Sequence, residues 1–211
     1  LHVSGAGDTG LMLQTTNAVD DKEIWEIQAA GDASNHANLI MRTRVNAGTG
    51  GSEAMRINNN GVVTIPSQPS FMVSMTNAPT LTGTATSTLP FNNEIYDVGN
   101  NFNTSTYVFT APVAGKYHMH VHFEMHSDST WSNSTWTYIG DFYVNGVQKT
   151  GADYWGHSGK YNVISNTALL DLGANDNVNV RARPNNNTLK YTGDATSGAY
   201  SNSRWFGYLV G

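Results

Sequence analysis

The stretch from Tyr107 to His126 (YVFTAPVAGKYHMHVHFEMH) constrains the fold of this chain more than any other. It contains a turn signal at Ala111–Gly115, because proline lacks an amide donor and glycine tolerates a positive φ. After this turn, Tyr, Met, Val, Phe and Met alternate with His, His, His, Glu and His. A period of two residues predicts a long β-strand with one buried face. We therefore expect two strands joined by this turn, and a core built against the Tyr, Met, Val and Phe side chains.

The composition favours strands and turns over helices. The 211-residue chain is rich in Gly, Asn, Ser and Thr, and only 13% of its residues are charged. These residue types disfavour long helices and favour turns and strands. No segment has the periodicity of an amphipathic helix, so the sequence predicts an all-β protein of one or two domains.

Charge and residue usage exclude several classes of function. The formal net charge is −5 and no basic patch occurs, so nucleic-acid binding through phosphate contacts is not expected. The chain has no Cys, which excludes disulfides and thiolate metal sites. No apolar run is long enough to cross a bilayer, so membrane insertion is not expected either. Because the sequence starts at Leu1 without a signal sequence, we expect a fragment of a longer protein.

Residues 1–66 predict a small β-rich domain. Its candidate strands are short and cover residues 11–14, 23–28, 38–45, 54–57 and 62–65. The last two flank Asn60-Gly61, a dipeptide typical of type I′ hairpin turns. Because each strand has few large apolar residues, the segment alone has a marginal core. We expect it to bury an apolar face against copies of itself in an oligomer.

Residues 67–211 predict a second, larger domain. Pro66 and Pro69 mark the boundary, since prolines interrupt hydrogen bonding and stiffen a short linker. Asn145-Gly146 predicts a second hairpin turn, and the segment Thr80–Leu89 is expected to be a loop with short edge strands. Regularly spaced strands predict a sandwich or jelly roll. They cover residues 71–75, 94–98, 106–110, 137–144, 162–172, 177–183 and 204–210.

Five motifs in this second domain resemble the globular head of complement C1q. In chain order they are Phe91–Asp97 (FNNEIYD), Tyr107–Tyr117 (YVFTAPVAGKY), Phe142–Gly146 (FYVNG), Thr167–Val178 (TALLDLGANDNV) and Trp205–Val210 (WFGYLV). The resemblance covers about residues 70–211 and implies a jelly roll of the tumour-necrosis-factor type that assembles as a homotrimer. It further implies that the terminal strand and the strand of Phe109 lie near the three-fold axis. The strand of the histidines is implied to lie in the outer sheet, away from that axis.

The first domain is similar to a different family. Glu53–Ile65 (EAMRINNNGVVTI) resembles a short segment common in bacteriophage tail fibres, which typically precedes a distal tip. Together the two resemblances imply the distal end of a viral fibre, located extracellularly on the virion, with a β-rich shaft or knob followed by a jelly-roll head. The absence of collagen-like repeats from the sequence distinguishes it from animal complement proteins.

The histidine row is the first candidate site. His118, His120 and His122 share one strand face, and Glu124 and His126 extend it. Imidazoles at this spacing could ligate Zn²⁺, Ni²⁺ or Fe²⁺. A solvated polar face opposite a buried one explains the same row without a metal, and we favour that interpretation.

Aromatic-rich loops are the second candidate site. Aromatic faces stack on sugar rings, and loops on a rigid sandwich are the usual place for recognition. The alternative is that these side chains pack beneath the loops or at a trimer interface. The residues predicted to contact ligand are Trp131, Trp136, Tyr154, Trp155, His157 and Tyr161, with Trp131 and Trp155 the strongest of them.

Signals of catalysis are poor. The chain has no recognisable catalytic triad, phosphate-binding loop or zinc-protease motif. Its acidic residues match no calcium loop, and nothing in the sequence brings Glu124, Asp141 and Asp153 together as a carboxylate pair. We therefore expect a protein that is not an enzyme and needs no cofactor.

The sequence leaves three functional hypotheses. The first is a homotrimeric fibre tip that continues an upstream fibre segment and binds a host-surface receptor, expected to be a glycan, through the avidity of three identical sites. The second is a secreted complement-like lectin of cellular origin. The third, a polysaccharide-degrading tailspike, is disfavoured because the repeats of a long β-helix are absent.

Overall fold

A computed structural model describes residues 9–14, 24–31, 37–44, 51–76, 79–125, 137–151, 153–154, 162–191 and 203–211. Contacts divide the chain into two compact units, Leu1–Gln68 and Pro69–Gly211. Every regular element within the described residues is a β-strand, which confirms the all-β prediction.

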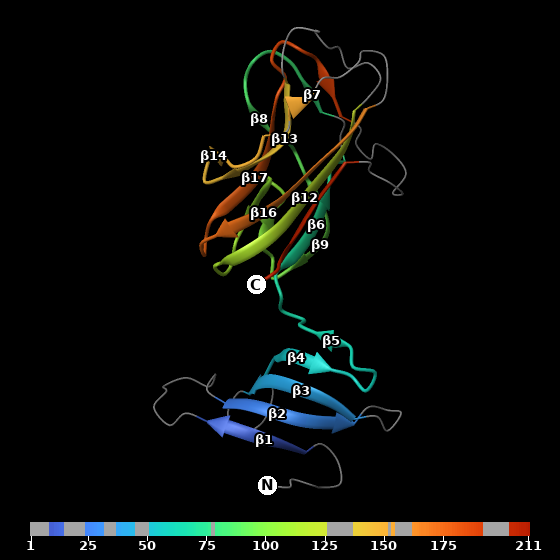
Figure 1. The fold of residues 1–211 in the computed structure, drawn as a ribbon, viewed down its shortest axis with the longest axis vertical. Helices are drawn as coiled ribbons and strands as arrows, with labels where there is room; N and C mark the ends of the chain where they lie inside the picture. Colours follow the sequence, from blue (N-terminus) through green and yellow to red (C-terminus); the bar gives the residue numbers. More distant parts are fainter. Residues whose placement is uncertain are drawn as a thin grey trace. The chain divides into compact units, whose positions relative to one another are not determined.

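The first unit contains one antiparallel sheet in the order β1-β2-β3-β4-β5 (Figure 1). Strands that are neighbours in sequence pair throughout, so the sheet is a meander. The strands are β1 (Thr9–Gln14), β2 (Ile24–Gly31), β3 (Ala37–Arg44), β4 (Glu53–Ile57) and β5 (Val63–Thr64).

The turn between β4 and β5 differs from the predicted type I′ hairpin. Ile57 pairs with Val63, so the connection is the loop of residues 58–62 rather than a two-residue turn. Within this loop only Gly61 has a positive φ, of 79°. The side-chain oxygen of Asn58 accepts hydrogen bonds from the backbone N–H groups of Asn60 and Val62, at 3.0 and 2.9 Å. These bonds stabilise a wider loop in which Asn60 does not need the left-handed region.

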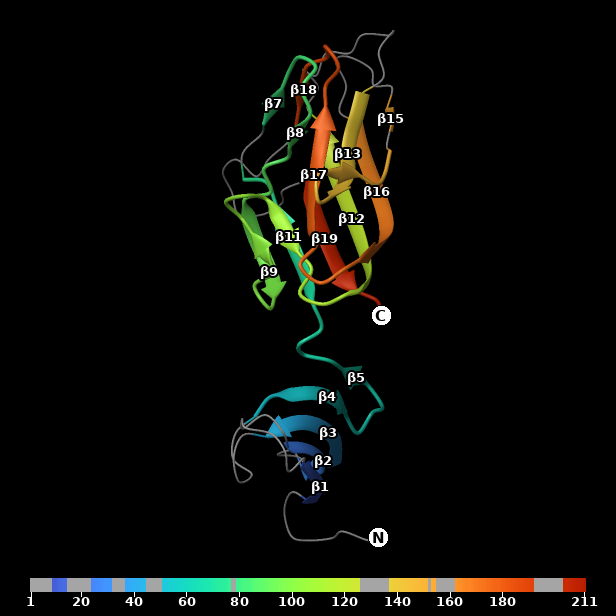
Figure 2. The ribbon, with the colours of Figure 1, turned by 90° about the vertical axis from the view of Figure 1, so that its left-hand side faces the viewer.

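The second unit is a sandwich of two antiparallel sheets (Figures 1 and 2). One sheet, called the histidine sheet below, has the order β16-β12-β19-β6-β9. Its strands are β6 (Ser70–Ser74), β9 (Asn93–Val98), β12 (Gly115–Met125), β16 (Asn162–Leu172) and β19 (Arg204–Leu209).

The facing sheet has the order β10-β11-β17-β13-β14, with β8 against β17 and β15 against β13. A short pair, β7 (Thr80–Leu81) and β18 (Leu189–Lys190), stands apart from both sheets. This arrangement confirms the predicted jelly-roll sandwich. The strands of the facing sheet are β8 (Ser87–Thr88), β10 (Phe102–Asn103), β11 (Val108–Thr110), β13 (Thr137–Val144), β14 (Val147–Gln148), β15 (Asp153–Tyr154) and β17 (Asn177–Arg183).

The alternation predicted for β12 is confirmed. This strand pairs with β16 along its whole length and with β19 on its other side, so it lies inside the histidine sheet. Its apolar face points into the sandwich, whereas the histidine face is partly exposed. The side chains that are 0% exposed are Tyr117, Met119, Val121, Phe123 and Met125.

The centre of the core is a group of aromatic rings around Trp205. The ring centroid of Trp205 lies 5.1 Å from Phe71, 5.2 Å from Phe102 and 5.8 Å from Phe91, all in edge-to-face arrangements. Such arrangements place a positive ring edge against a negative ring face, which adds to the gain from burial. These rings come from both sheets, so they hold the two layers of the sandwich together.

The hairpin between β13 and β14 has the predicted turn. Val144 pairs with Val147, and the two central residues, Asn145 and Gly146, have φ values of 50° and 80°. A positive φ at both central positions defines a type I′ turn.

The strand of Phe109 lies in the facing sheet. The resemblance implied that it shares a position near a three-fold axis with the terminal strand. In the structure β11 and β19 belong to different sheets, and the Phe109 ring stacks on Phe71 at 4.7 Å inside the core of its own chain.

Candidate functional site

The outward face of the histidine sheet carries the predicted histidine row. Residues directly opposite one another in paired strands share a face, so the register of β12 identifies the neighbours of each ring. They are Leu169 and Tyr208 for His118, Thr167 and Phe206 for His120, and Ser165 and Arg204 for His122.

Each histidine has its own partner on a neighbouring strand. The Nδ1 atom of His120 is hydrogen-bonded to the hydroxyl of Thr167 at 2.7 Å, and that of His122 to the hydroxyl of Ser165 at 3.0 Å. The His120 ring stacks on Phe206 with a centroid distance of 4.9 Å. The His118 ring lies 5.0 Å from the Tyr208 ring. The row is therefore part of an aromatic surface that spans β12 and β19.

Burial and neighbouring charge favour the neutral form of His120. Desolvation lowers the pKa of His120 below its usual 6.5, and the positive charges that His122 and His118 can carry lower it further. A neutral imidazole beside aromatic rings can pack against an apolar surface and still form hydrogen bonds.

Within the described part of one chain, His118, His120 and His122 are not arranged as a metal site. Among the described residues, no group of three or more His, Asp or Glu side chains is arranged to hold a metal ion. The rings of His120 and His122 are instead held by hydroxyl groups on β16.

The histidine strand and the terminal strand, which the resemblance placed apart relative to a three-fold axis, lie side by side. β12 and β19 are hydrogen-bonded neighbours in one sheet, from Tyr117 opposite Leu209 to His122 opposite Arg204. The histidines and the aromatic residues of the terminal strand therefore form one continuous face. Sequence spacing alone cannot reveal this, because the pairing joins segments far apart in the chain.

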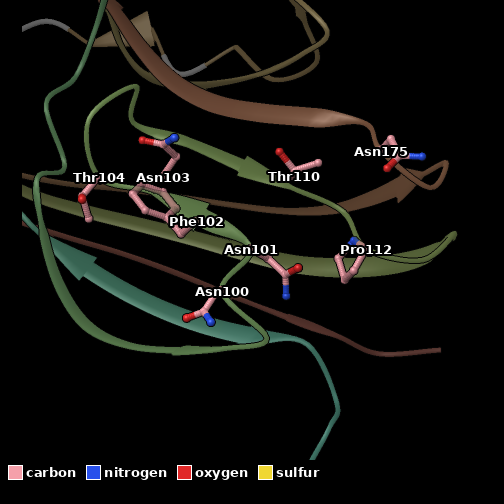
Figure 3. Close-up of a pocket in the computed structure, with 8 residues that line it drawn as sticks. All are labelled: Asn100, Asn101, Phe102, Asn103, Thr104, Thr110, Pro112 and Asn175. Carbon is pink, nitrogen blue, oxygen red and sulfur yellow. The ribbon is translucent and has the colours of Figure 1, made fainter.

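A polar hollow lies on another part of the sandwich (Figure 3). It has a volume of about 710 Å³, and no charged side chain lines it. The Thr110 hydroxyl donates to the side-chain oxygen of Asn177 at 2.9 Å, and the Asn101 amide donates to the carbonyl of Val98 at 2.9 Å. The lining residues are Asn100, Asn101, Phe102, Asn103, Thr104, Thr110, Pro112 and Asn175.

The hollow offers neutral hydrogen-bonding groups and little aromatic surface. The one aromatic residue in its lining, Phe102, is 7% exposed and packs with Phe71 and Trp205 in the core. No motif in the sequence pointed to this site. Its residues come from β10, β11 and the turns near them, and the Asn-rich sequence of these turns signals only the turns themselves.

Most of the residues predicted to contact a ligand lie outside the described residues. These are Trp131, Trp136, Trp155, His157 and Tyr161. For Tyr154 the structure gives the strand position, opposite Thr137 of β13.

The described strand ends that flank these segments meet at one end of the sandwich. Met125, which precedes residues 126–136, pairs with Asn162, which follows residues 155–161. Met125 also forms a bridge with Tyr191, which precedes residues 192–202. Ser70, at the start of β6, lies toward the opposite end of the sheet, where the C-terminus also lies (Figure 1).

Comparison with known families identifies the second unit. Residues 70–210 match the C1q domain. The chain belongs to the C1q domain family. The sandwich described above is therefore a C1q domain, as the motifs predicted.

Solved structures resemble the C1q domain of this chain at low sequence identity. The globular domain of zebrafish complement 1qA matches with a TM-score of 0.51 and 17% identity, covering 68% of this chain and 98% of that chain. Murine APRIL at pH 5.0 matches with a TM-score of 0.49 and 12% identity, covering 68% of this chain and 99% of that chain. None of the curated proteins compared with this chain matches it significantly. At such identities, likeness between structures bears on the fold alone.

No helix long and apolar enough to cross a membrane occurs in the part of the chain that the structure describes.

Proposed function

We propose that this chain is the homotrimeric receptor-binding tip of a bacteriophage tail fibre, without enzymatic activity. Its C1q domain is the head, and the first unit continues the fibre toward the virion. The head binds a surface receptor of the bacterial host, expected to be a glycan, and three identical sites act together through avidity.

The observation that carries this proposal is the combination of two parts in one chain. A C1q domain at residues 70–210 follows a small sheet whose β4–β5 segment resembles a segment of tail fibres. Members of the C1q and tumour-necrosis-factor families assemble as homotrimers, which supports self-association of this head. A trimeric head on a fibre presents several copies of one weak site to a repeating surface, which is how attachment fibres achieve strong binding.

The proposed contact residues are those of the aromatic-rich segments. Their flanking strand ends lie at the end of the sandwich opposite the start of β6. This placement supports recognition at the far end of the head, because the chain from the first unit joins the C1q domain at Pro69. The proposed residues are Trp131, Trp136, Tyr154, Trp155, His157 and Tyr161.

The test is binding of the labelled protein to a panel of bacterial strains and to polysaccharide extracted from each. We expect Trp155→Ala to abolish binding to strains that the parent protein binds, while the molar mass from light scattering stays that of the parent. Val147→Ala is the control, because Val147 is 59% exposed and pairs with Val144, at the end of β13 opposite Thr137.

Binding curves of Trp155→Ala that overlay those of the parent would contradict the assignment of that segment. Failure of the parent protein to bind any bacterial surface would contradict the attachment function. Release of reducing sugar during the incubation would indicate an enzyme instead of a binding module.

A further inference from the structure

The sheet of the first unit has one largely exposed apolar face, and its opposite face is mixed, with polar and apolar side chains that are buried on β2 and β3. On β2 the residues alternate, so that Glu26 and Gln28 are 7% and 4% exposed whereas Trp25 is 43% exposed. This is the reverse of the usual pattern, in which the apolar side of a strand is buried.

The register extends the apolar face across all five strands. Because residues directly opposite each other share a face, the pairings place nine large apolar side chains together. Ionisable side chains are absent from the described positions of this face. The apolar face consists of Leu11, Leu13, Trp25, Ile27, Leu39, Met41, Met55, Ile57 and Val63.

The opposite face of the same sheet holds the charged groups. The side chain of Arg44 donates to a carboxylate oxygen of Glu26 at 2.6 Å, and Arg42 lies 3.8 Å from the same oxygen. The buried apolar residues among the described part of this unit are only Ile24, Ala30 and Ile40. This small core leaves the unit with little hydrophobic stabilisation unless the apolar face is also covered.

The size of the apolar face matches that of a protein interface. Six of its side chains are 36–53% exposed. Together the nine side chains expose on the order of 600 Å² of apolar surface, close to the roughly 800 Å² per partner of a standard interface. The N-terminal segments outside the described residues contain only Leu1, Val3, Val19 and Val45 as large aliphatic residues, so their sequences offer little to cover it.

We propose that the apolar face of the first unit packs against the same face of other copies of this chain. The inference rests on the homotrimer of the proposed function, because a trimeric head brings three copies of the face together at high effective concentration. A face without charges has no groups to pair with a polar partner, and three equivalent apolar faces exclude water from one another. The first unit is then a second association module, built from residues outside the C1q domain.

Disulfide cross-linking of the full-length chain tests this contact. The natural chain has no Cys, so a single introduced Cys reports only its own position. Leu39→Cys and Met41→Cys place a thiol on β3, the middle strand of the sheet. Val62→Cys is the matched control, because Val62 is 53% exposed in the same unit but lies in the loop before β5, outside the apolar face.

Under a mild oxidant, we expect disulfide-linked dimers of Leu39→Cys and Met41→Cys to form about tenfold or more faster than those of Val62→Cys. Equal rates for the three variants would overturn the proposal, since proximity through the head alone affects all three alike. The three variants of the purified chain also cross-link at equal rates if this face is covered by another protein or by nothing, and either case overturns the proposal.

A charge variant tests the same contact without oxidation. Leu39→Lys places identical charges from several copies in one apolar interface, so we expect a lower midpoint of thermal unfolding and a higher rate of proteolysis within the first unit. Val62→Lys, the matched control, is expected to leave both unchanged. A Leu39→Lys variant that behaves like its control would overturn the proposal.

Light scattering on the same samples separates the possible failures. A trimer without preferential cross-linking overturns only this inference, whereas a monomer overturns the homotrimer as well. A cross-linked trimer that binds no bacterial surface overturns the attachment function and leaves this inference standing.

Discussion

At the scale of single residues, Gly207 in β19 is fixed by the packing of the core. A Cβ atom at this position would lie 2.9 Å from Cε1 of Phe71 and would also collide with the sulfur of Met119. Both neighbours are 0% exposed, so neither can move into solvent. We expect Gly207→Ala to lower the free energy of unfolding by about 1–3 kcal/mol, the usual cost of overpacking a core. Urea unfolding monitored by tryptophan fluorescence measures this difference.

Gly151→Ala is the control for Gly207→Ala. Nothing lies within 4 Å of a Cβ built at Gly151, so this variant should unfold at the urea concentration of the parent. Equal unfolding midpoints for the two variants would contradict the packing argument.

We expect His120 to make the stability of the C1q domain depend on pH. Its pKa in the folded protein is lowered, chiefly by burial and then by the charges of His122 and His118. The unfolded chain, with a pKa near 6.5, therefore binds the proton more readily than the folded chain. The stabilisation is fully present above about pH 6.5 and is lost as the pH falls through this value toward the lower folded pKa.

The thermal midpoint between pH 8 and pH 5 measures this effect. We expect the midpoint of the parent to fall with acidification more steeply than that of His120→Gln, which keeps a hydrogen-bonding group opposite Thr167 but cannot be protonated. Parallel curves for the two proteins would show that His120 does not contribute to the pH dependence.

At the scale of elements, Asn145 connects the β13–β14 turn to the β16–β17 turn. Its side-chain amide donates to Asp176 at 2.7 Å, and its side-chain oxygen accepts from the backbone N–H of Asn177 at 2.9 Å. Asn145 also has a φ of 50°, which asparagine tolerates better than alanine. We expect Asn145→Ala to lose both hydrogen bonds. The strain of a positive φ at alanine should lower the free energy of unfolding by a further ~1–2 kcal/mol.

Asn145→Gly separates the two effects, because glycine accepts the positive φ but cannot form the side-chain hydrogen bonds. Its unfolding midpoint in urea should lie between those of the parent and Asn145→Ala. An Asn145→Ala midpoint equal to that of the parent would contradict both contributions.

Local sequence patterns predicted the elements whose signals are local. The alternation after Gly115 identified β12, and the strands at residues 162–172 and 177–183 lie where the sequence places them. Asn145-Gly146 forms its type I′ turn, whereas the similar pair Asn60-Gly61 does not. The difference arises because the Asn58 side chain stabilises a longer loop, and a dipeptide signal does not include that contact.

Features that depend on long-range pairing could not be predicted in this way. The histidine row was visible in the sequence, but its neighbours Phe206 and Thr167 follow from the register of β12 with β19 and β16. Pairing between segments far apart in the chain also decides that β12 lies in the histidine sheet and β11 in the facing sheet. The apolar face of the first unit was expected from its thin core, but its residues became identifiable only from the pairing of β1 to β5.

At the scale of the whole molecule, the molar mass in solution is the most informative quantity. The histidine sheet exposes aromatic surface at Phe206 and Tyr208, and the first unit exposes its apolar face. Each surface favours self-association through burial of apolar area. We expect light scattering to give three times the chain mass of 22.8 kDa.

Adding a chelator to the same sample distinguishes two ways of holding the trimer together. If apolar packing holds it, the mass should not change, because His120 and His122 already have hydroxyl partners within their own chain. If the chelator dissociates the trimer, a metal ion holds the copies together, and the histidine row becomes the first candidate for its ligands. A monomer in both conditions would instead mean that neither surface associates, and the fibre-tip proposal would fail with it.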